Sequence, residues 1–163
     1  MEIVVISDTH LSSPDYILEK EYDTQFSKAD ILVHCGDYTS EDVWAYLNSH
    51  PYFLGVAGNM DSGYWAHNLN HQLVIKFKGI KIGILHGYDL DFSRIEIDIT
   101  SRFPEDVNFI FFGHTHTRFF KQVGDDKYII NPGSFTFPKG HKQGYVKIRF
   151  SNIGEIGVQW VDL

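Results

Sequence analysis

Five short apolar runs in this chain each end at side chains that can bind a metal ion. The runs are residues 2–7, 31–34, 52–56, 80–85 and 108–112. Their β-branched and aromatic content predicts buried strands. The clusters that follow the runs contain Asp8 and His10, Asp37, Asn59, His86, and His114 and His116. Because α/β proteins bind ligands at the carboxyl ends of their strands, the pattern predicts a ligand site built from these loops.

Helical patterns separate the first three runs. A helix start is offered by Ser12, Ser13 and Pro14, and a weak apolar stripe continues to about Lys28. A second, shorter helix is predicted from Ser40. The order strand, helix, strand, helix, strand favours parallel strand pairs that are covered by helices.

The rest of the chain predicts a second set of strands. Residues 73–77 and 80–85 flank a Lys-Gly pair and indicate a hairpin. A helix is predicted over residues 92–103, although its β-branched residues weaken the pattern. Further strands are expected at residues 118–123, 128–130, 145–150 and 156–161. We therefore expect one α/β domain over residues 1–163, with two packed mixed β-sheets flanked by helices.

Length, charge and cysteine content narrow the function classes. At 163 residues the chain fits one domain with a single core. Its formal net charge of -7 repels a phosphate backbone, which argues against a long nucleic acid as partner. The single cysteine, Cys35, excludes an internal disulfide and is expected as a small buried residue, not as a nucleophile. The sequence has neither an apolar stretch of about 20 residues nor a signal-peptide pattern, so we expect a cytoplasmic protein with no membrane partner.

Spacing and ligand chemistry support a metal site. Asp8 and His10 are two residues apart, as are His114 and His116, and extended backbone would point each pair to one side. The donors are carboxylate, amide oxygen and imidazole without thiolate, a mixture that suits manganese, iron, zinc, nickel or cobalt. Loop caps and turn formers explain a single Asp or Asn, but they do not explain four histidines in these positions.

The number of donors points to two cations. Seven ligands are too many for one tetrahedral zinc and fit two cations that share a carboxylate. Asp37 is the natural bridge, because it has two oxygens and follows Gly36, which lets it lie deep in the site. Two cations ~3.5–4 Å apart lower the pKa of a shared water and neutralise phosphate oxygens during displacement. We expect two divalent metal ions, manganese first among them, and a small phosphate-ester substrate.

The motifs also resemble those of a known family. The chain resembles the calcineurin-like metallophosphoesterases in the ordered series Asp8-x-His10, Gly36-Asp37, Gly58-Asn59-x-Asp61, His86 and Gly113-His114-x-His116. With the later Asn131-Pro132-Gly133-Ser134, it is similar to the small bacterial and archaeal phosphodiesterases, and the resemblance spans residues 3–134. It implies an αββα sandwich and a homodimer or higher homo-oligomer. It also implies a first metal held by Asp8, His10 and His116, a second held by Asn59, His86 and His114, and Asp37 as the bridge.

Catalytic roles follow from the same resemblance. Asp37, Asn59 and His86 are carried over as catalytic residues, and Asn59 is also expected to contact substrate. Many larger relatives carry a His directly after this Asn, where it can protonate the leaving group, but this chain has Met60. Substrates with good leaving groups are therefore expected, and Asp61 is a candidate either for the acid or for support of the site.

Three further residues are candidates for substrate binding, each with a plain structural alternative. His34 precedes Asp37 by three residues and can contact substrate, orient the site or lie in the core. Gly133 and Ser134 belong to the 131–134 motif, which can offer backbone N–H groups to a phosphate or form an ordinary turn.

Some histidines and aromatic residues lie outside the motifs. We expect exposed or interface positions for His50, His67, His71 and His141. Exposure is also expected for Tyr64, Trp65, Phe135 and Phe137, which would form either a subunit contact or a wall of the substrate cleft.

Three functions are weighed against one another. The leading prediction is hydrolysis of small phosphodiesters by a metal-activated hydroxide. The second is a non-catalytic protein-binding scaffold like the retromer subunit, which resembles this family but lacks key ligands; the complete ligand set here favours the enzyme. The third is a nucleotide-directed nuclease or cyclic nucleotide phosphodiesterase, and the short, acidic chain argues against a long nucleic-acid track.

Overall fold

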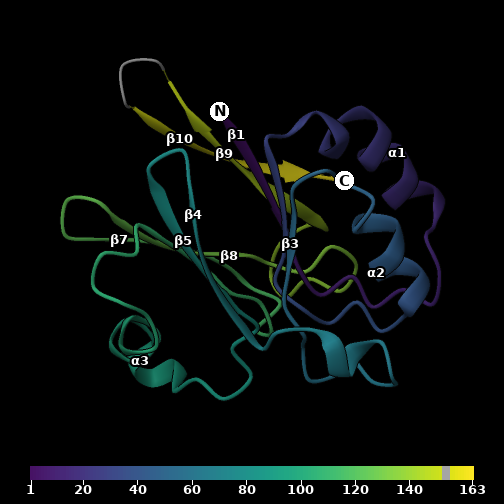
Figure 1. The fold of residues 1–163 in the computed structure, drawn as a ribbon, viewed down its shortest axis with the longest axis horizontal. Helices are drawn as coiled ribbons and strands as arrows, with labels where there is room; N and C mark the ends of the chain where they lie inside the picture. Colours follow the sequence, from purple (N-terminus) through teal and green to yellow (C-terminus); the bar gives the residue numbers. More distant parts are fainter. Residues whose placement is uncertain (152–154) are drawn as a thin grey trace.

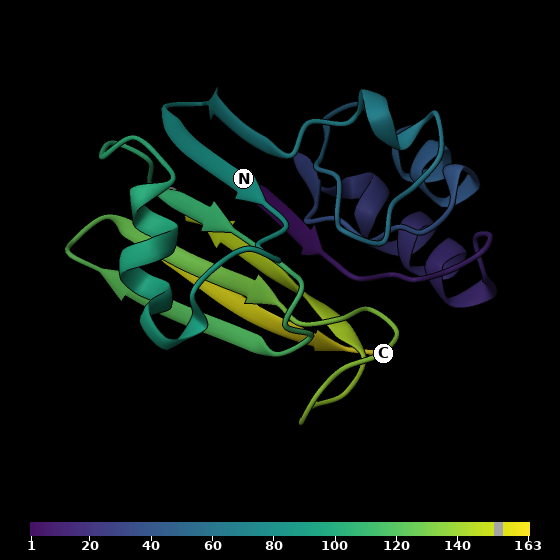
Figure 2. The same cartoon turned by 90° about the horizontal axis from the view of Figure 1, so that it is seen from below.

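The computed structural model describes residues 1–151 and 155–163 and contains two five-stranded β-sheets. Helices α1 (Tyr16–Thr24) and α2 (Glu41–Leu47) lie beside the first sheet, and α3 (Ile95–Ser101) lies beside the second (Figures 1 and 2). This arrangement confirms the predicted fold class, with two mixed sheets flanked by helices.

The first sheet has the order β10-β9-β1-β2-β3. Its strands are β1 (Glu2–Ile6), β2 (Ile31–His34), β3 (Phe53–Gly55), β9 (Gly144–Phe150) and β10 (Ile156–Asp162). The pairs β1–β2 and β2–β3 are parallel, as the alternation of strands and helices predicts, whereas β9 is antiparallel to both β1 and β10. The loops that follow β1, β2 and β3 therefore leave the sheet at the same end.

The second sheet has the order β4-β5-β6-β8-β7. Its strands are β4 (Gln72–Phe77), β5 (Ile80–Leu85), β6 (Phe109–Phe111), β7 (Arg118–Val123) and β8 (Lys127–Pro132). Lys78 and Gly79, with φ of 46° and 87°, form the predicted hairpin turn between β4 and β5. Because β5 and β6 pair in parallel, the loops that follow these two strands also leave at one end.

Side-chain caps start the first two helices. Asp15 accepts the N–H of Leu18 at 2.8 Å, so α1 begins slightly after its predicted start. Ser40 accepts the N–H of Val43 at 3.3 Å and begins α2 where it was predicted. The rest of the first helical pattern is completed by the 3₁₀ turn η1 (Phe26–Lys28).

The predicted helix over residues 92–103 is divided. A 3₁₀ turn, η3 (Phe92–Arg94), comes first, and α3 follows it. Asp91 caps η3 by accepting the N–H of Ser93 at 3.0 Å, and the β-branched residues of α3 favour a short helix. Another 3₁₀ turn, η2 (Ala66–Asn68), follows the loop after β3. Within the described ranges, none of the helices is long and apolar enough to cross a membrane.

The main core lies between the two sheets. Its fully buried members alternate along the facing strands and include Ile3, Val5, Ile31, Val33, Ile82, Ile84, Phe109, Phe111, Ile130, Val146 and Ile148. A second cluster packs α1 and α2 onto the outer face of the first sheet, and a third packs α3 onto the second sheet. The strands are therefore fixed on both faces, and this fixes the positions of the loops at their ends.

Candidate metal centre

The loops after five strands bring the predicted ligands to one place. Five of these residues, in three loops, have left-handed backbone conformations: Asp8, His10, Asp37, His114 and His116, with φ between 45° and 65°. Such values are uncommon for residues other than glycine and cluster at functional sites. The predicted reason for the convergence, extended backbone with a spacing of two, is therefore wrong. The paired side chains meet because the chain turns sharply at each of them.

One group of ligands is centred on Asp8. Its Oδ1 lies 3.2 Å from His116 Nε2 and 3.9 Å from His10 Nε2, and the two histidine nitrogens are 3.3 Å apart. The other oxygen, Oδ2, accepts hydrogen bonds from Ser7 Oγ and from the N–H of His114. The Oδ1 atom is fully buried and has no hydrogen-bond donor among the described residues. A buried carboxylate oxygen that faces two imidazole nitrogens is a good ligand for a cation.

A second group surrounds Asp37. Its Oδ2 lies 3.3 Å from His86 Nε2 and 3.7 Å from His10 Nε2, and its Oδ1 accepts the N–H of Met60 at 2.8 Å. Ligand atoms of Asp8, Asp37 and His86 all lie within 4.8 Å of one another. The two groups are therefore continuous, and Asp37 lies where they meet.

Asn59 completes the second group. Its Oδ1 lies 3.1 Å from His86 Nε2 and 3.0 Å from His114 Nδ1. The structure thus brings all of the predicted ligands together, drawn from the loops after β1, β2, β3, β5 and β6.

Backbone carbonyls fix the orientation of two histidines. Nδ1 of His86 donates to the carbonyl of Cys35 at 2.7 Å, and Nδ1 of His116 donates to the carbonyl of Phe137 at 2.7 Å. Since a carbonyl can only accept, the proton of each neutral ring is on Nδ1 and the lone pair is on Nε2. In both rings Nε2 is the atom that faces the carboxylates.

The charges of the cluster are suited to cations. Burial raises the pKa of Asp37, but its bonds with His86 and the Met60 N–H lower it by more, so the net shift is downward. Within the part of the chain that the structure describes, the ion pairs of Asp8 and Asp37 are with histidines and not with Lys or Arg. The cluster therefore offers carboxylates, an amide oxygen and imidazoles to a divalent metal, and these residues fit such an ion.

Asp61 joins the loops that carry the ligands. One of its oxygens accepts the N–H groups of Asp37 at 2.9 Å and Gly58 at 2.7 Å, and the other accepts the N–H of Thr39 at 2.8 Å. Burial raises the pKa of this carboxyl group. Because both oxygens are occupied by backbone donors, the geometry favours a positioning role for Asp61 over that of a proton donor.

His34 lies beneath the cluster and has no surface exposure. Its Nδ1 accepts the N–H of Gly36 at 3.0 Å, its Nε2 lies 3.2 Å from Thr9 Oγ1, and its ring stacks on Tyr38. The Nε2 contact joins the end of β2 to the loop after β1, and the Nδ1 bond fixes the start of the loop after β2. This placement fits the alternative of a core or orienting residue and leaves His34 without access to a substrate.

Gly133 and Ser134 are also enclosed. The Ser134 hydroxyl donates to the carbonyl of Asp8 at 2.8 Å and accepts the N–H of Phe137 at 2.8 Å. The N–H of Gly133 donates to Asn131 Oδ1 at 2.8 Å. These two groups are used within the protein: the Ser134 hydroxyl supports the Asp8 loop, and neither it nor the Gly133 N–H is presented to a phosphate.

Two exposed phenyl rings lie beside the proposed ligand histidines. Phe92 is 42% exposed and stacks on His114, with ring centroids 6.1 Å apart and planes 16° apart. Phe137 is 60% exposed, and its ring centroid is 6.0 Å from that of His10. Phe137 was expected to be exposed, but Phe92 was missed because the sequence placed it in a continuous helix with no feature that directs it to the site.

The expected exposure of the other aromatics is correct only in part. Tyr64 is exposed, and Trp65 is half-buried against Trp44. Phe135 is fully buried because its ring packs edge-on against Phe26. Among the remaining histidines, His67 and His71 are exposed as expected and His141 is half-buried. Cys35 is buried, also as expected.

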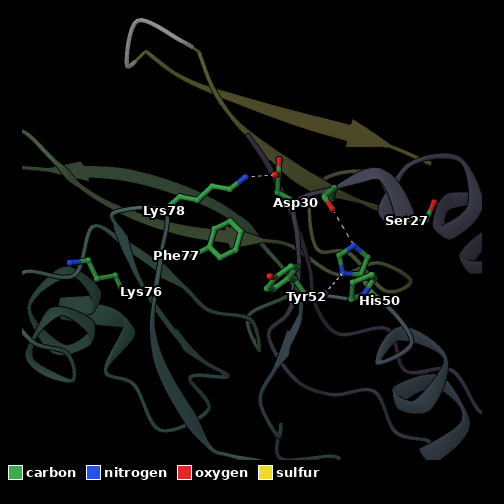
Figure 3. Close-up of a pocket in the computed structure, with 9 residues that line it drawn as sticks. Ser27, Asp30, His50, Tyr52, Lys76, Phe77 and Lys78 are labelled. Atoms are coloured by element: carbon green, nitrogen blue, oxygen red, sulfur yellow. Dashed lines mark hydrogen bonds and ion pairs between the residues drawn. The ribbon is translucent and has the colours of Figure 1, made fainter.

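A cavity of about 640 Å³ lies away from the cluster, at the amino ends of β2 and β3 and beside the end of β4 (Figure 3). Lys78 pairs there with Asp30 at 2.8 Å. His50 is buried, contrary to the expected exposure, because its Nδ1 accepts the N–H of Tyr52 and its Nε2 donates to the carbonyl of Ala29. The charged and imidazole groups named here are engaged with one another or with the backbone, so the ligand cluster remains the candidate site.

Comparison with known proteins establishes the family. A family model described as the calcineurin-like phosphoesterase superfamily domain matches residues 1–152. This chain belongs to that superfamily. A probable metallophosphoesterase of Methanocaldococcus jannaschii is 33% identical over 151 residues, which are 91% of this chain and 75% of the relative. A phosphodiesterase of the same organism is 29% identical over 145 residues, with 82% of this chain and 83% of that protein covered.

Solved structures agree with the superfamily fold. A predicted phosphoesterase from Streptococcus pneumoniae has a TM-score of 0.75 and 25% identity, over 99% of this chain and 88% of that one. Vps29 from Chaetomium thermophilum has a TM-score of 0.75 and 22% identity, over 98% and 95%, a likeness that concerns the fold alone. The predicted family and its phosphoesterase class are thereby confirmed. Phosphoesterases of this superfamily use divalent metals, and this chain has candidate ligand groups for them.

Proposed function

We propose that this protein hydrolyses small phosphodiesters at a pair of divalent cations. The observation that carries the proposal is the position of Asp37 Oδ2, which lies 3.3 Å from His86 Nε2 and 3.7 Å from His10 Nε2. One carboxylate oxygen thus faces both histidine groups, as expected of a ligand shared by two cations. When bound, such cations make water nucleophilic near neutral pH and neutralise charge on the phosphate.

Each ligand has an assigned place in this proposal. Asp8, His10 and His116 would hold the first cation, Asn59, His86 and His114 would hold the second, and Asp37 would serve both. The carbonyls of Cys35 and Phe137 orient the histidines that they contact, so that Nε2 is presented as the ligand atom. We propose manganese as the resident metal, with iron, zinc, nickel and cobalt as the alternatives to be compared.

The leaving group receives little help from the chain in this proposal. Met60 is 56% exposed and follows Asn59, and its thioether cannot donate a proton. Asp61 is assigned a positioning role because backbone N–H groups occupy both of its oxygens. Esters whose leaving groups depart as stable anions, such as nitrophenyl esters, are therefore the expected substrates.

The test combines metal analysis with turnover. Purified protein is analysed for metals and then assayed on bis-p-nitrophenyl phosphate with each of the five candidate metals. We expect Asn59→Ala and His86→Ala to lose more activity than the ~10–100-fold that loss of an outer partner costs, with the circular dichroism spectrum unchanged. His67→Ala is the matched control, because this exposed histidine lies outside the ligand cluster. Full activity in both ligand variants contradicts the mechanism.

The same experiment separates the alternative functions. A protein that binds none of the metals and has no activity supports a scaffold role, which the fold shared with Vps29 makes the natural second candidate. A parallel assay on cyclic nucleotides tests the third candidate, and turnover of these in preference to the nitrophenyl ester supports the nucleotide-directed alternative.

A further inference from the structure

We infer that Phe92 and Phe137 form two binding walls that select phosphodiesters with a planar aromatic group on each side of phosphorus. The inference rests on the proposed function and adds a substrate class to it. Phe92 stacks on His114, which belongs to the second ligand group, and Phe137 lies beside His10, which belongs to the first. A phosphodiester bound between the two ligand groups would have Phe92 beside one of its ester groups and Phe137 beside the other.

The exposure of these rings is the first argument. Phe92 is 42% exposed and Phe137 is 60% exposed, although a phenyl ring gains free energy when it is removed from water. Two more apolar side chains from the ligand loops, Met60 and Tyr88, are also exposed. Exposed apolar residues grouped around a polar centre mark a ligand-binding surface.

The second argument is that the backbone next to each ring is held in place. Phe92 is the first residue of η3, whose cap Asp91 accepts the N–H of Ser93 at 3.0 Å and pairs with Arg94 at 3.2 Å. Such fixed walls lose little conformational entropy when a ligand binds.

Both backbone polar groups of Phe137 are hydrogen-bonded. Its N–H donates to Ser134 Oγ at 2.8 Å, and its carbonyl accepts from His116 at 2.7 Å. The backbone of Phe137 is thus bonded both to Ser134, which supports the Asp8 loop, and to the proposed ligand His116.

The third argument comes from charge. Arg118 follows His116 by two residues, but its guanidinium pairs with Asp162 at 2.8 Å and lies over the ring of Trp160. This arginine is therefore held by the C-terminal strand and does not serve as a clamp for phosphate oxygens. The exposed rings of Phe92 and Phe137 offer the ester groups apolar and stacking contacts, for which planar aromatic groups are suited.

The test compares two diesters that share one leaving group. The substrates are phenyl p-nitrophenyl phosphate and methyl p-nitrophenyl phosphate, assayed with wild-type protein, Phe92→Ala and Phe137→Ala. One ring contacts the leaving group and the other contacts the retained group. We therefore expect one variant to lower kcat/KM about 3- to 10-fold for both esters, and the other to lower it by that factor for the phenyl ester only.

Controls separate selectivity from damage. Phe120→Ala removes a comparably exposed phenyl ring on β7, which contacts Tyr128 and not a ligand, and it should leave the phenyl-to-methyl ratio unchanged. Phe92→Tyr and Phe137→Tyr should keep the wild-type ratio, because tyrosine retains the planar ring. Metal content and thermal midpoint should be the same in all variants.

The outcomes are distinct. If the wild-type protein is active and neither alanine variant changes the ratio, the aromatic walls are refuted and the proposed phosphodiesterase function stands. If the wild-type protein binds metals but cleaves neither ester, the proposed function and this inference fail together. A lower ratio in Phe92→Ala or Phe137→Ala, with the wild-type ratio kept in the matching Phe92→Tyr or Phe137→Tyr variant, supports the inference.

Discussion

Asp61 accepts the backbone N–H of Asp37 at 2.9 Å, and this bond joins the loop after β3 to the backbone of the residue at the centre of the cluster. The same carboxyl group accepts the N–H groups of Gly58 and Thr39. The Asp61 carboxylate thus holds the loop after β3 against the loop after β2, and both loops carry proposed ligands.

Removal of the Asp61 carboxylate should lower both the free energy of unfolding and the affinity for metal. Asp61→Ala leaves the backbone donors without a partner, which costs about 1–3 kcal/mol for each one that stays buried, and we expect a loss of ~10–100-fold in metal affinity. Denaturant unfolding and metal titration measure the two effects. A positioning residue affects good and poor leaving groups equally. A fall confined to esters with poor leaving groups would instead assign Asp61 the role of general acid.

The close packing around Gly36 predicts that a side chain at this position disturbs both metal binding and stability. A Cβ at this position, where φ is 97°, would lie 2.8 Å from the Gly58 nitrogen and 2.8 Å from His86 Nδ1. We expect Gly36→Ala to lose metal binding and to destabilise the fold by more than the ~1 kcal/mol of an unfavourable φ. Gly79→Ala is the matched control, because φ there is 87° and nothing lies within 4 Å. Equal unfolding free energies for the two variants would contradict the clash.

Metal removal should destabilise the protein. Without cations, the Asp8 and Asp37 carboxylates offer ligand atoms within 4.8 Å of each other, so their negative charges repel. Metal at about 100 times its dissociation constant stabilises the folded state by ~2.7 kcal/mol, and a chelator abolishes this gain. Differential scanning calorimetry with chelator, and after the metal is restored, measures the shift. A thermal midpoint that does not respond to either addition argues against a metal held by the folded chain.

The metal-dependent part of the stability should grow as pH rises. The Asp8 carboxylate, 3.2 Å from His116 Nε2, raises the pKa of His116 above its ordinary value. Burial lowers the pKa of His86, but the bond to Asp37 and the neighbouring carboxylates raise it by more, so its net shift is also upward. In metal-free protein these two groups stabilise the fold fully below the unfolded pKa of about 6.5, and the gain is lost as pH rises through their folded values.

A ligand histidine must lose its proton to bind metal, so metal affinity changes in the opposite direction. We therefore expect the difference in thermal midpoint between metal-loaded and metal-free protein to increase from about pH 6 to about pH 8. Parallel melting curves with and without chelator at each pH give this difference directly. A constant difference would contradict histidine coordination.

The position of the site was more predictable than its local geometry. Asp37 and His86 could be placed from sequence because each ends an apolar run, and parallel strands bring such ends together. The left-handed conformation of Asp8 and His10 could not be inferred, because neither residue carries the glycine signature of that backbone.

Burial was the other property that the sequence did not reveal. His50 and Phe135 lie in polar or loop-like surroundings in the sequence, yet both are buried. A backbone carbonyl satisfies His50, and the ring of Phe26, more than a hundred residues away in the chain, covers Phe135. Such contacts depend on packing between distant segments, which a local pattern does not record.

The first strand of this chain lies between partners made at very different times during synthesis. β1 pairs with β2 on one side and with β9 on the other, and the Ser134 hydroxyl supports the Asp8 loop across 126 residues of sequence. A growing polypeptide that has only its amino-terminal half outside the ribosome therefore lacks His86, His114 and His116, and it also lacks the Ser134 hydroxyl that supports the Asp8 loop. We expect a nascent chain to bind metal at the complete candidate site only after these residues have been synthesised.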